Sequence, residues 1–96
     1  MTVEEMRLFQ DNHDEEFLKF RSIKGDTPSQ RADLCAMILI DSLLPGIGDI
    51  VSAAEHDQIW LDADAGALAP LITEDQWLYL IRCGVMLDDD SLSLYV

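Results

Sequence analysis

Two aspartates at alternate positions, Asp62 and Asp64, come closest to a metal-binding motif, because they precede Gly66 as the first carboxylates of a calcium loop precede its glycine. Alternating carboxylates of this kind could converge on a hard cation. A calcium loop also needs a third Asp or Asn before the glycine and a bidentate Glu at its twelfth position, which here is Thr73. We therefore interpret Asp62 as the end of a strand and Asp64 as a helix cap.

The acidic run 88–90 and the two histidines are the next candidates for chemistry. The run could hold a divalent ion loosely, but a solvated turn is the favoured interpretation. His13 precedes Asp14, and His56 lies between two acidic residues, so nearby carboxylates could orient both imidazoles. A two-histidine metal site would need long-range convergence. We favour two ordinary histidines and expect no metal and no cofactor.

The cysteines and the glycine pair 46–48 do not suggest catalysis. Cys35 lies in an apolar run and Cys83 near an expected helix end, and neither has a histidine close in sequence. In a reducing compartment both are expected to be small buried hydrophobic residues rather than a disulfide. The Gly-Ile-Gly segment lacks the further glycines and the lysine of a phosphate loop. Since no catalytic cluster can be assembled, we expect that the protein is not an enzyme.

Charge is distributed very unevenly along the chain. Residues 1–31 carry seven acidic and five basic side chains, whereas residues 32–96 carry twelve acidic side chains and one base, Arg82. The formal net charge is −13. A field of this sign repels nucleic acid and anionic membranes and attracts basic protein surfaces.

Length and composition predict one folded domain covering residues 1–96. Hydrophobic residues make up 49% of the sequence, which is too many for a disordered acidic chain. The first residues have neither the basic start nor the apolar run of a secretory signal, and no apolar stretch reaches the ~20 residues that span a bilayer. We therefore expect a cytoplasmic protein, in the host cytoplasm if it is phage-encoded.

The pattern of the first half predicts helices. An amphipathic helix is expected over residues 3–23, with a break near Asp11 and Asn12. Thr27 followed by Pro28 is a strong start signal for the next helix. The run 32–44 is apolar nearly all round, which suits either a central core helix or one shared with a partner subunit.

The second half predicts short helices and a small sheet. We expect a short helix over 49–55, a strand over 57–62 and a short helix over 64–68. Thr73 opens a further helix with a capping box, and Gly84 ends it. A hairpin formed by 85–87 and 91–96 should pair with strand 57–62, with Leu92, Leu94 and Val96 on one face. The fold class is therefore α+β: a mainly helical small domain with a short antiparallel sheet.

The order strand, helix, helix and hairpin over residues 57–96 resembles a winged helix-turn-helix. In a DNA reader of that kind, the second helix and the wing carry Lys and Arg. Here the expected wing turn consists of three aspartates, so the charge is inverted. The segments from Arg82 to Val85 and from Ser91 to Val96 also resemble small, uncharacterised bacteriophage proteins, from which no functional residue carries over.

Two functional hypotheses follow. In the first, the protein is a small acidic inhibitor that binds a basic, nucleic-acid-binding protein, as DNA-mimicking phage proteins and anti-CRISPR proteins do. In the second, it is a homodimeric interaction or assembly module whose acidity serves only solubility. Direct binding to nucleic acid or to a membrane is not expected. Trp60 is a candidate for a partner-facing position and Trp77 for the core. The predicted protein-binding residues are Asp57, Trp60, Asp62, Asp64, Glu74, Asp75, Asp88, Asp89 and Asp90.

Overall fold

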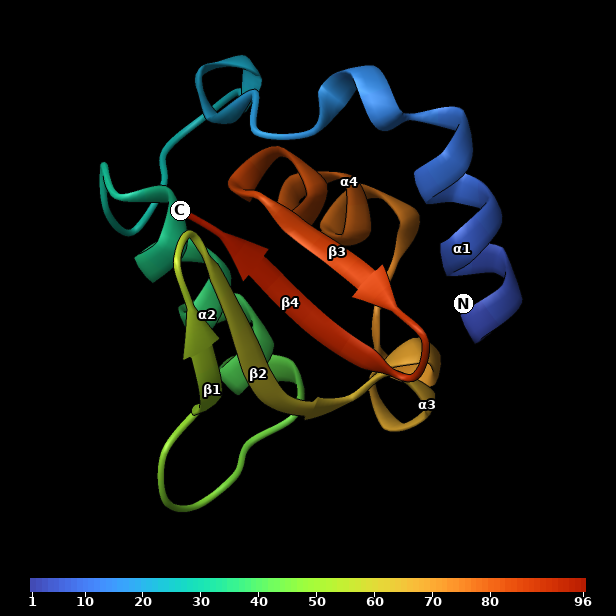
Figure 1. The fold of residues 1–96 in the computed structure, drawn as a ribbon. Coiled ribbons are helices and arrows are strands. Elements are labelled where there is room, and N and C mark those ends of the chain that lie inside the picture. Colours follow the sequence, from blue (N-terminus) through green and yellow to red (C-terminus); the bar gives the residue numbers. More distant parts are fainter.

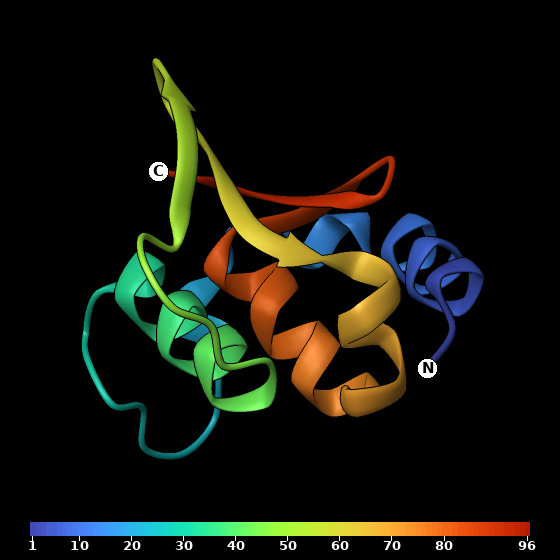
Figure 2. The same cartoon turned by 90° about the horizontal axis from the view of Figure 1, so that it is seen from below.

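Four strands form one antiparallel sheet, and the helices lie on one side of it (Figures 1 and 2). The computed structural model describes all residues from 1 to 96. The order of strands across the sheet is β1-β2-β4-β3. Along the chain the elements are α1 (Val3–Asn12), two 3₁₀ turns (Asp14–Glu16 and Phe20–Ser22), α2 (Ala32–Leu43), β1 (Val51–Glu55), β2 (Gln58–Asp64), α3 (Ala65–Leu68) with a 3₁₀ turn (Ala69–Leu71), α4 (Glu74–Cys83), β3 (Val85–Asp88) and β4 (Ser91–Tyr95).

The predicted pairing of the 57–62 strand with the C-terminal strand is confirmed. β4 lies between β2 and β3, and Leu92 is opposite Leu61 on one side and Leu87 on the other. Two residues further along β4, Leu94 is opposite Ile59 and Val85. These rows face the helices, and Leu92 and Leu94 are completely buried. Val96 lies beyond these buried rows, because it follows the end of β4 and is 61% exposed.

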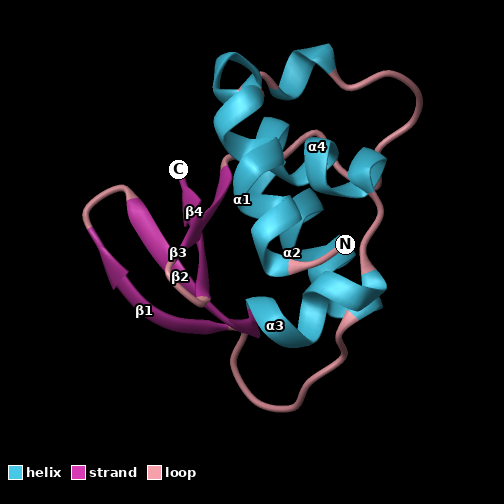
Figure 3. Cartoon of the chain, turned by 90° about the vertical axis from the view of Figure 1, so that its right-hand side faces the viewer, coloured by secondary structure: helices cyan, strands magenta, loops and turns pink.

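Helix α4 is the centre of the helical layer, with α1 and α2 on either side of it (Figure 2), and this layer lies beside the sheet (Figure 3). Trp77, Leu80 and Ile81 are buried because they recur at the three- to four-residue spacing of one helix face. The predicted capping box at Thr73 is present, and the predicted terminal glycine, Gly84, is left-handed with φ 104°. The expectation that Trp77 lies in the core is confirmed, since it is completely buried.

The expected helix over 49–55 is wrong, because Val51–Glu55 form strand β1 and the two residues before them belong to a loop. This segment has too few apolar residues for their spacing to distinguish a helix from a strand. Hydrogen bonding to β2 makes it a strand. Ala53 and Ala54 lie opposite Trp60 and Ile59 of β2. A two-residue turn joins the strands, with His56 in the left-handed region at φ 53°.

The expected helix start at Thr27 is also wrong, since α2 begins at Ala32. The Thr27 hydroxyl donates to the carbonyl of Ser29 at 2.6 Å, so it closes a local turn instead of capping a helix. The predicted break near Asp11 and Asn12 in the first helix is confirmed, because α1 ends at Asn12. Short 3₁₀ turns follow the break instead of more α-helix. Leu18, between these turns, has φ 65°, a conformation that an α-helix cannot contain.

Candidate functional site

Four of the predicted acidic residues lie at one end of the sheet, at the turn between β3 and β4. The register places Asp64 and Asp88 opposite the same residue, Ser91, and Asp89 and Asp90 form the turn between those strands. The Ala65 amide donates to the carbonyl of Asp90 at 3.0 Å, which ties the start of α3 to this turn. We call Asp88, Asp89 and Asp90 the acidic turn.

The carboxylates of the acidic turn are exposed and have no basic side chain paired with them. Arg7 of α1 approaches, but its guanidinium donates to the backbone carbonyl of Asp89 at 3.1 Å rather than to a carboxylate. The one side-chain ion pair of the protein joins Arg82 to Glu16, at 3.1 Å. The acidic turn is therefore held in place through its backbone while its charges stay available.

Asp64 and Asp62 differ from the acidic turn in what they contact. The Asp64 carboxylate accepts a hydrogen bond from the Ala67 amide at 2.9 Å and caps α3, as the sequence predicts. Asp62 lies within β2 and lines a small hollow together with Asp41 and Asp49, beside the loop that leads into β1. Asp64 thus has a structural role, and Asp62 belongs to a second acidic region.

The other predicted binding residues lie elsewhere, so the nine do not form one surface. Asp57 is in the β1–β2 turn at the opposite end of the sheet, where its carbonyl accepts from the Val96 amide at 2.9 Å. Glu74 and Asp75 are exposed in the first turn of α4, within the helical layer. Trp60 is half-buried. Successive side chains of a strand point to opposite faces of the sheet, and Ile59 and Leu61 belong to the rows that face the helices, so Trp60 lies on the other face.

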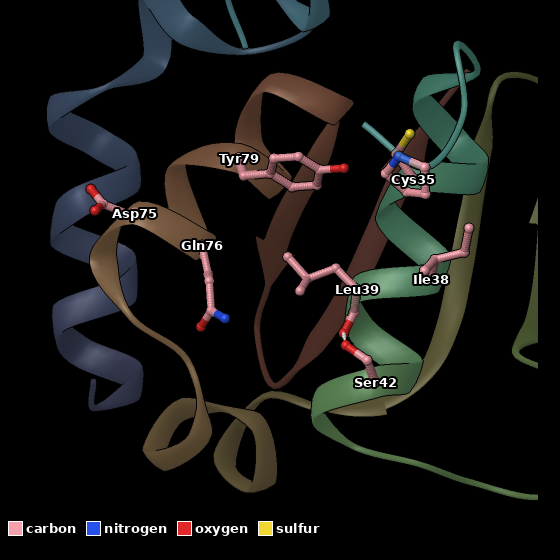
Figure 4. A pocket seen from close by; sticks show the side chains of 8 residues that line it. Cys35, Ile38, Leu39, Ser42, Asp75, Gln76 and Tyr79 are labelled. Carbon is pink, nitrogen blue, oxygen red and sulfur yellow. Dashed lines mark hydrogen bonds between the residues drawn. The ribbon is translucent and has the colours of Figure 1, made fainter. Parts of the chain in front are cut away.

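A groove between α2 and α4 is a feature that the sequence reasoning missed (Figure 4). It has a volume of about 320 Å³, and its walls combine apolar side chains of α2 with the Tyr79 ring of α4. No local pattern pointed to it, because residues from distant segments line it. They are Pro28, Cys35, Ile38, Leu39, Ser42, Asp75, Gln76 and Tyr79.

The polar groups of this groove are mostly engaged. The Cys35 thiol donates to the Ser29 carbonyl at 3.1 Å, and the Ser42 hydroxyl donates to the Leu39 carbonyl at 2.7 Å. Burial raises the pKa of the Tyr79 hydroxyl, and its hydrogen bond with Cys35 raises that pKa further. Outside the groove, burial raises the pKa of the Cys83 thiol to about 12. Tyr79 and Cys83 are therefore protonated at neutral pH, and the Cys83 thiol is a poor nucleophile.

The histidines lie apart from one another. Nδ1 of His13 is 2.8 Å from the carbonyl of Phe9, and its ring stacks on the Phe9 ring with centroids 3.9 Å apart. His56 is exposed in the β1–β2 turn. No group of three or more His, Cys, Asp or Glu side chains is arranged to hold a metal ion.

The arrangement therefore offers binding surfaces: an exposed acidic turn, an apolar groove and an open sheet face. Cys35 and Cys83 are both buried as free thiols. No helix combines the length and apolar character needed to cross a bilayer. No protein-family model, no curated protein and no solved structure matches this chain.

Proposed function

We propose that the protein binds a basic surface of a nucleic-acid-binding protein through the acidic turn and so keeps nucleic acid from that surface. The observation that carries the proposal is the acidic turn itself, three exposed carboxylates with no basic side chain paired with them. Opposite Lys and Arg side chains they can take the place of phosphates. A field of net charge −13 speeds the encounter with such a partner.

The backbone contacts of the acidic turn support this function because they limit the entropy lost on binding. The turn is held by the β3–β4 pairing, by Arg7 at the carbonyl of Asp89 and by the Ala65 amide at the carbonyl of Asp90. A turn whose backbone is held in this way loses little backbone freedom when a partner binds.

The winged-helix resemblance is part of this proposal, with α4 as the second helix and the β3–β4 hairpin as the wing. α1 and α2 pack on either side of α4, so this helix is poorly placed to enter a DNA groove. Its one base, Arg82, is paired with Glu16. We therefore propose that the wing binds protein and that the chain does not bind DNA or RNA. Its site of action is then the cytoplasm, that of the host for a phage-encoded chain.

The test replaces Asp88, Asp89 and Asp90 together by Asn. Proteins captured on the immobilised wild-type chain from bacterial lysate are eluted with duplex DNA, and the affinity of an eluted protein is measured at about 50 and 200 mM salt. We expect the triple variant to bind at least tenfold more weakly and with a shallower salt dependence.

A matched control removes the same number of charges from exposed positions outside the turn, in the variant Asp11→Asn, Glu15→Gln and Asp26→Asn. This variant should bind as the wild type does. Equal affinity of the acidic-turn variant and the wild type would overturn the proposal, as would the absence of any protein that duplex DNA elutes.

A second candidate function is assembly as a homodimer through α2, which exposed apolar side chains favour. Leu34 and Ile38 of α2 are 44% and 42% exposed, and Ile47 in the following loop is 97% exposed. Light scattering at micromolar concentration distinguishes a dimer from a single chain. Salt should strengthen this apolar association between like-charged copies, whereas it should weaken a complex with a basic partner.

A further inference from the structure

The two edges of the sheet differ in whether they are protected. At β3 the Leu87 amide, which would otherwise be free, donates to the Gln10 side-chain oxygen of α1 at 2.7 Å. α1 runs beside this strand (Figure 1). At the other edge, all five residues of β1 are exposed. The β1–β2 hairpin projects beyond the rest of the molecule, and no other segment lies alongside β1 (Figure 2).

The turn geometry shows which backbone groups of β1 are free. In a two-residue hairpin the residues that flank the turn, here Glu55 and Gln58, exchange both hydrogen bonds. Because bonded and non-bonded pairs alternate, Ala53 also bonds to β2, whereas Ala54 directs its N–H and C=O toward the open edge. β1 therefore presents an unpaired donor and acceptor to an additional strand.

β1 has one of the usual features that hinder edge pairing, a bulge between Val51 and Ala53, which lies before the open position at Ala54. The segment 51–54 contains no proline, lysine or other charged residue. Ala53 and Ala54 carry only methyl groups, so the backbone of an incoming strand and its side chains meet little obstruction. On the helical side, the hollow lined by Leu34, Ile38 and Ile50 offers apolar surface to cover.

Charge decides what kind of strand fits. Asp49 lies just before β1, Glu55 ends it and Asp57 lies in the next turn, while no basic residue occurs between positions 32 and 81. A second copy that paired antiparallel across a two-fold axis would bring Asp49 of one chain toward Glu55 and Asp57 of the other, and like charges facing each other destabilise a sheet. A strand with basic residues at both ends would instead meet opposite charges at both.

We propose that β1 accepts an extended segment of a basic protein as a fifth strand, with Lys or Arg side chains about six residues apart against Asp49 at one end and Glu55 and Asp57 at the other. Six residues of strand span roughly 20 Å. This inference rests on the proposed function only for the basic character of the partner. The contact that it adds is main-chain pairing, which is separate from the acidic turn.

The test uses a seven-residue peptide, acetylated and amidated, with lysine at both ends and alternating valine and threonine between them. Two further peptides serve as controls: one with glutamate at both ends, and one that keeps the lysines but has alternate backbone amides methylated. Binding is followed by amide chemical shifts and by hydrogen exchange at Ala54. We expect the lysine peptide to bind at least tenfold more tightly than either control and to slow exchange at Ala54.

Variants of the protein give the complementary test. Ala54→Pro removes the outward N–H without removing a β1–β2 hydrogen bond and should abolish peptide binding, whereas Ala54→Thr keeps the N–H and should retain it. The combined change Asp49→Asn, Glu55→Gln and Asp57→Asn should weaken binding at least tenfold. If Ala54→Pro unfolds the chain, comparing the methylated and unmethylated lysine peptides on the wild type still tests whether main-chain pairing is needed.

Three outcomes would overturn the inference: equal binding of the methylated peptide, shifts confined to the acidic turn, or pairing of β1 with a second copy in place of the peptide. Replacing Asp88, Asp89 and Asp90 should leave peptide binding unchanged. If the peptide fails to bind but the captured partner still depends on the acidic turn, strand addition is wrong and the proposed function stands. If the peptide binds β1 but replacing the acidic turn does not change the affinity of the captured partner, the proposed function is wrong and strand addition stands.

Discussion

The indole nitrogen of Trp77 donates a hydrogen bond to the backbone carbonyl of Met6 at 3.0 Å, and both residues are completely buried. This bond joins α4 to α1 across 71 positions of sequence. It satisfies the one polar atom of the tryptophan side chain in the core. A buried indole with a partner stabilises a small core, whereas an unpaired one would cost free energy.

We expect Trp77→Phe to lower the free energy of unfolding by about 1–3 kcal/mol, because it removes packing and the buried hydrogen bond to the Met6 carbonyl. Denaturant unfolding measures the change. Trp60→Phe is the control, since Trp60 is half-buried on the open face of the sheet. Equal losses in the two variants would contradict the role given to the Met6 contact.

Gly84→Ala should destabilise the protein by more than about 1–2 kcal/mol, the usual cost of a left-handed conformation for a residue with a Cβ. Gly84 has φ 104°, and an added Cβ would lie 2.8 Å from the Tyr95 carbonyl oxygen. Gly46→Ala is the matched control, because Gly46 has no positive φ and an added Cβ would meet nothing within 4 Å. The melting temperatures of both variants measure the effect. An unchanged melting temperature in Gly84→Ala would refute the close approach of position 84 to the Tyr95 carbonyl.

Thr73→Ala should cost about 1 kcal/mol of stability because it removes the capping box of α4. The Thr73 hydroxyl accepts from the Gln76 amide at 3.2 Å, and the Gln76 side chain accepts from the Thr73 amide at 3.0 Å. Thr73→Ser keeps the hydroxyl and should retain most of the stability. Urea unfolding compares the two, and an equal loss in both would mean that the methyl group matters rather than the cap.

The raised pKa of Cys83, about 12, predicts a loss of stability in alkaline solution. Below the ordinary thiol pKa of about 9 the thiol is protonated in both states, so its contribution is intact. Above that pH the unfolded chain releases the proton and the folded chain does not, so stability falls until the pH reaches about 12. Unfolding of the wild type and of Cys83→Ala from pH 8 upward tests this. Parallel pH profiles would contradict the assignment to Cys83.

Salt should raise the melting temperature, because a net charge of −13 opposes the compact state and ionic strength of about 0.1 M screens charges beyond roughly 10 Å. We expect a smaller rise in the variant with Asp88, Asp89 and Asp90 replaced by Asn, since it carries less charge to screen. Calorimetry at low and moderate sodium chloride measures both. A melting temperature independent of salt would show that the charges are too far apart to repel.

Local signals were enough to predict the fold from residue 57 onward. The capping box at Thr73, the glycine at position 84 and the alternation in the last strand all depend on neighbours within a few residues. The helix cap at Asp64 was predicted for the same reason. The α+β class and the pairing of β2 with β4 followed, because a hairpin with one apolar face needs a third strand.

Tertiary contacts decided what these signals left open. Residues 51–55 are a strand only because β2 offers an edge to pair with, and Thr27 closes a turn although its sequence is typical of a helix cap. The sequence determined that the protein is acidic, but the strand register decided that the acidic turn and Asp57 lie at opposite ends of the sheet. The groove between α2 and α4 likewise exists only where the two helices meet. Backbone propensity acts over a few residues, whereas a binding surface is assembled from residues far apart in sequence, which only packing brings together.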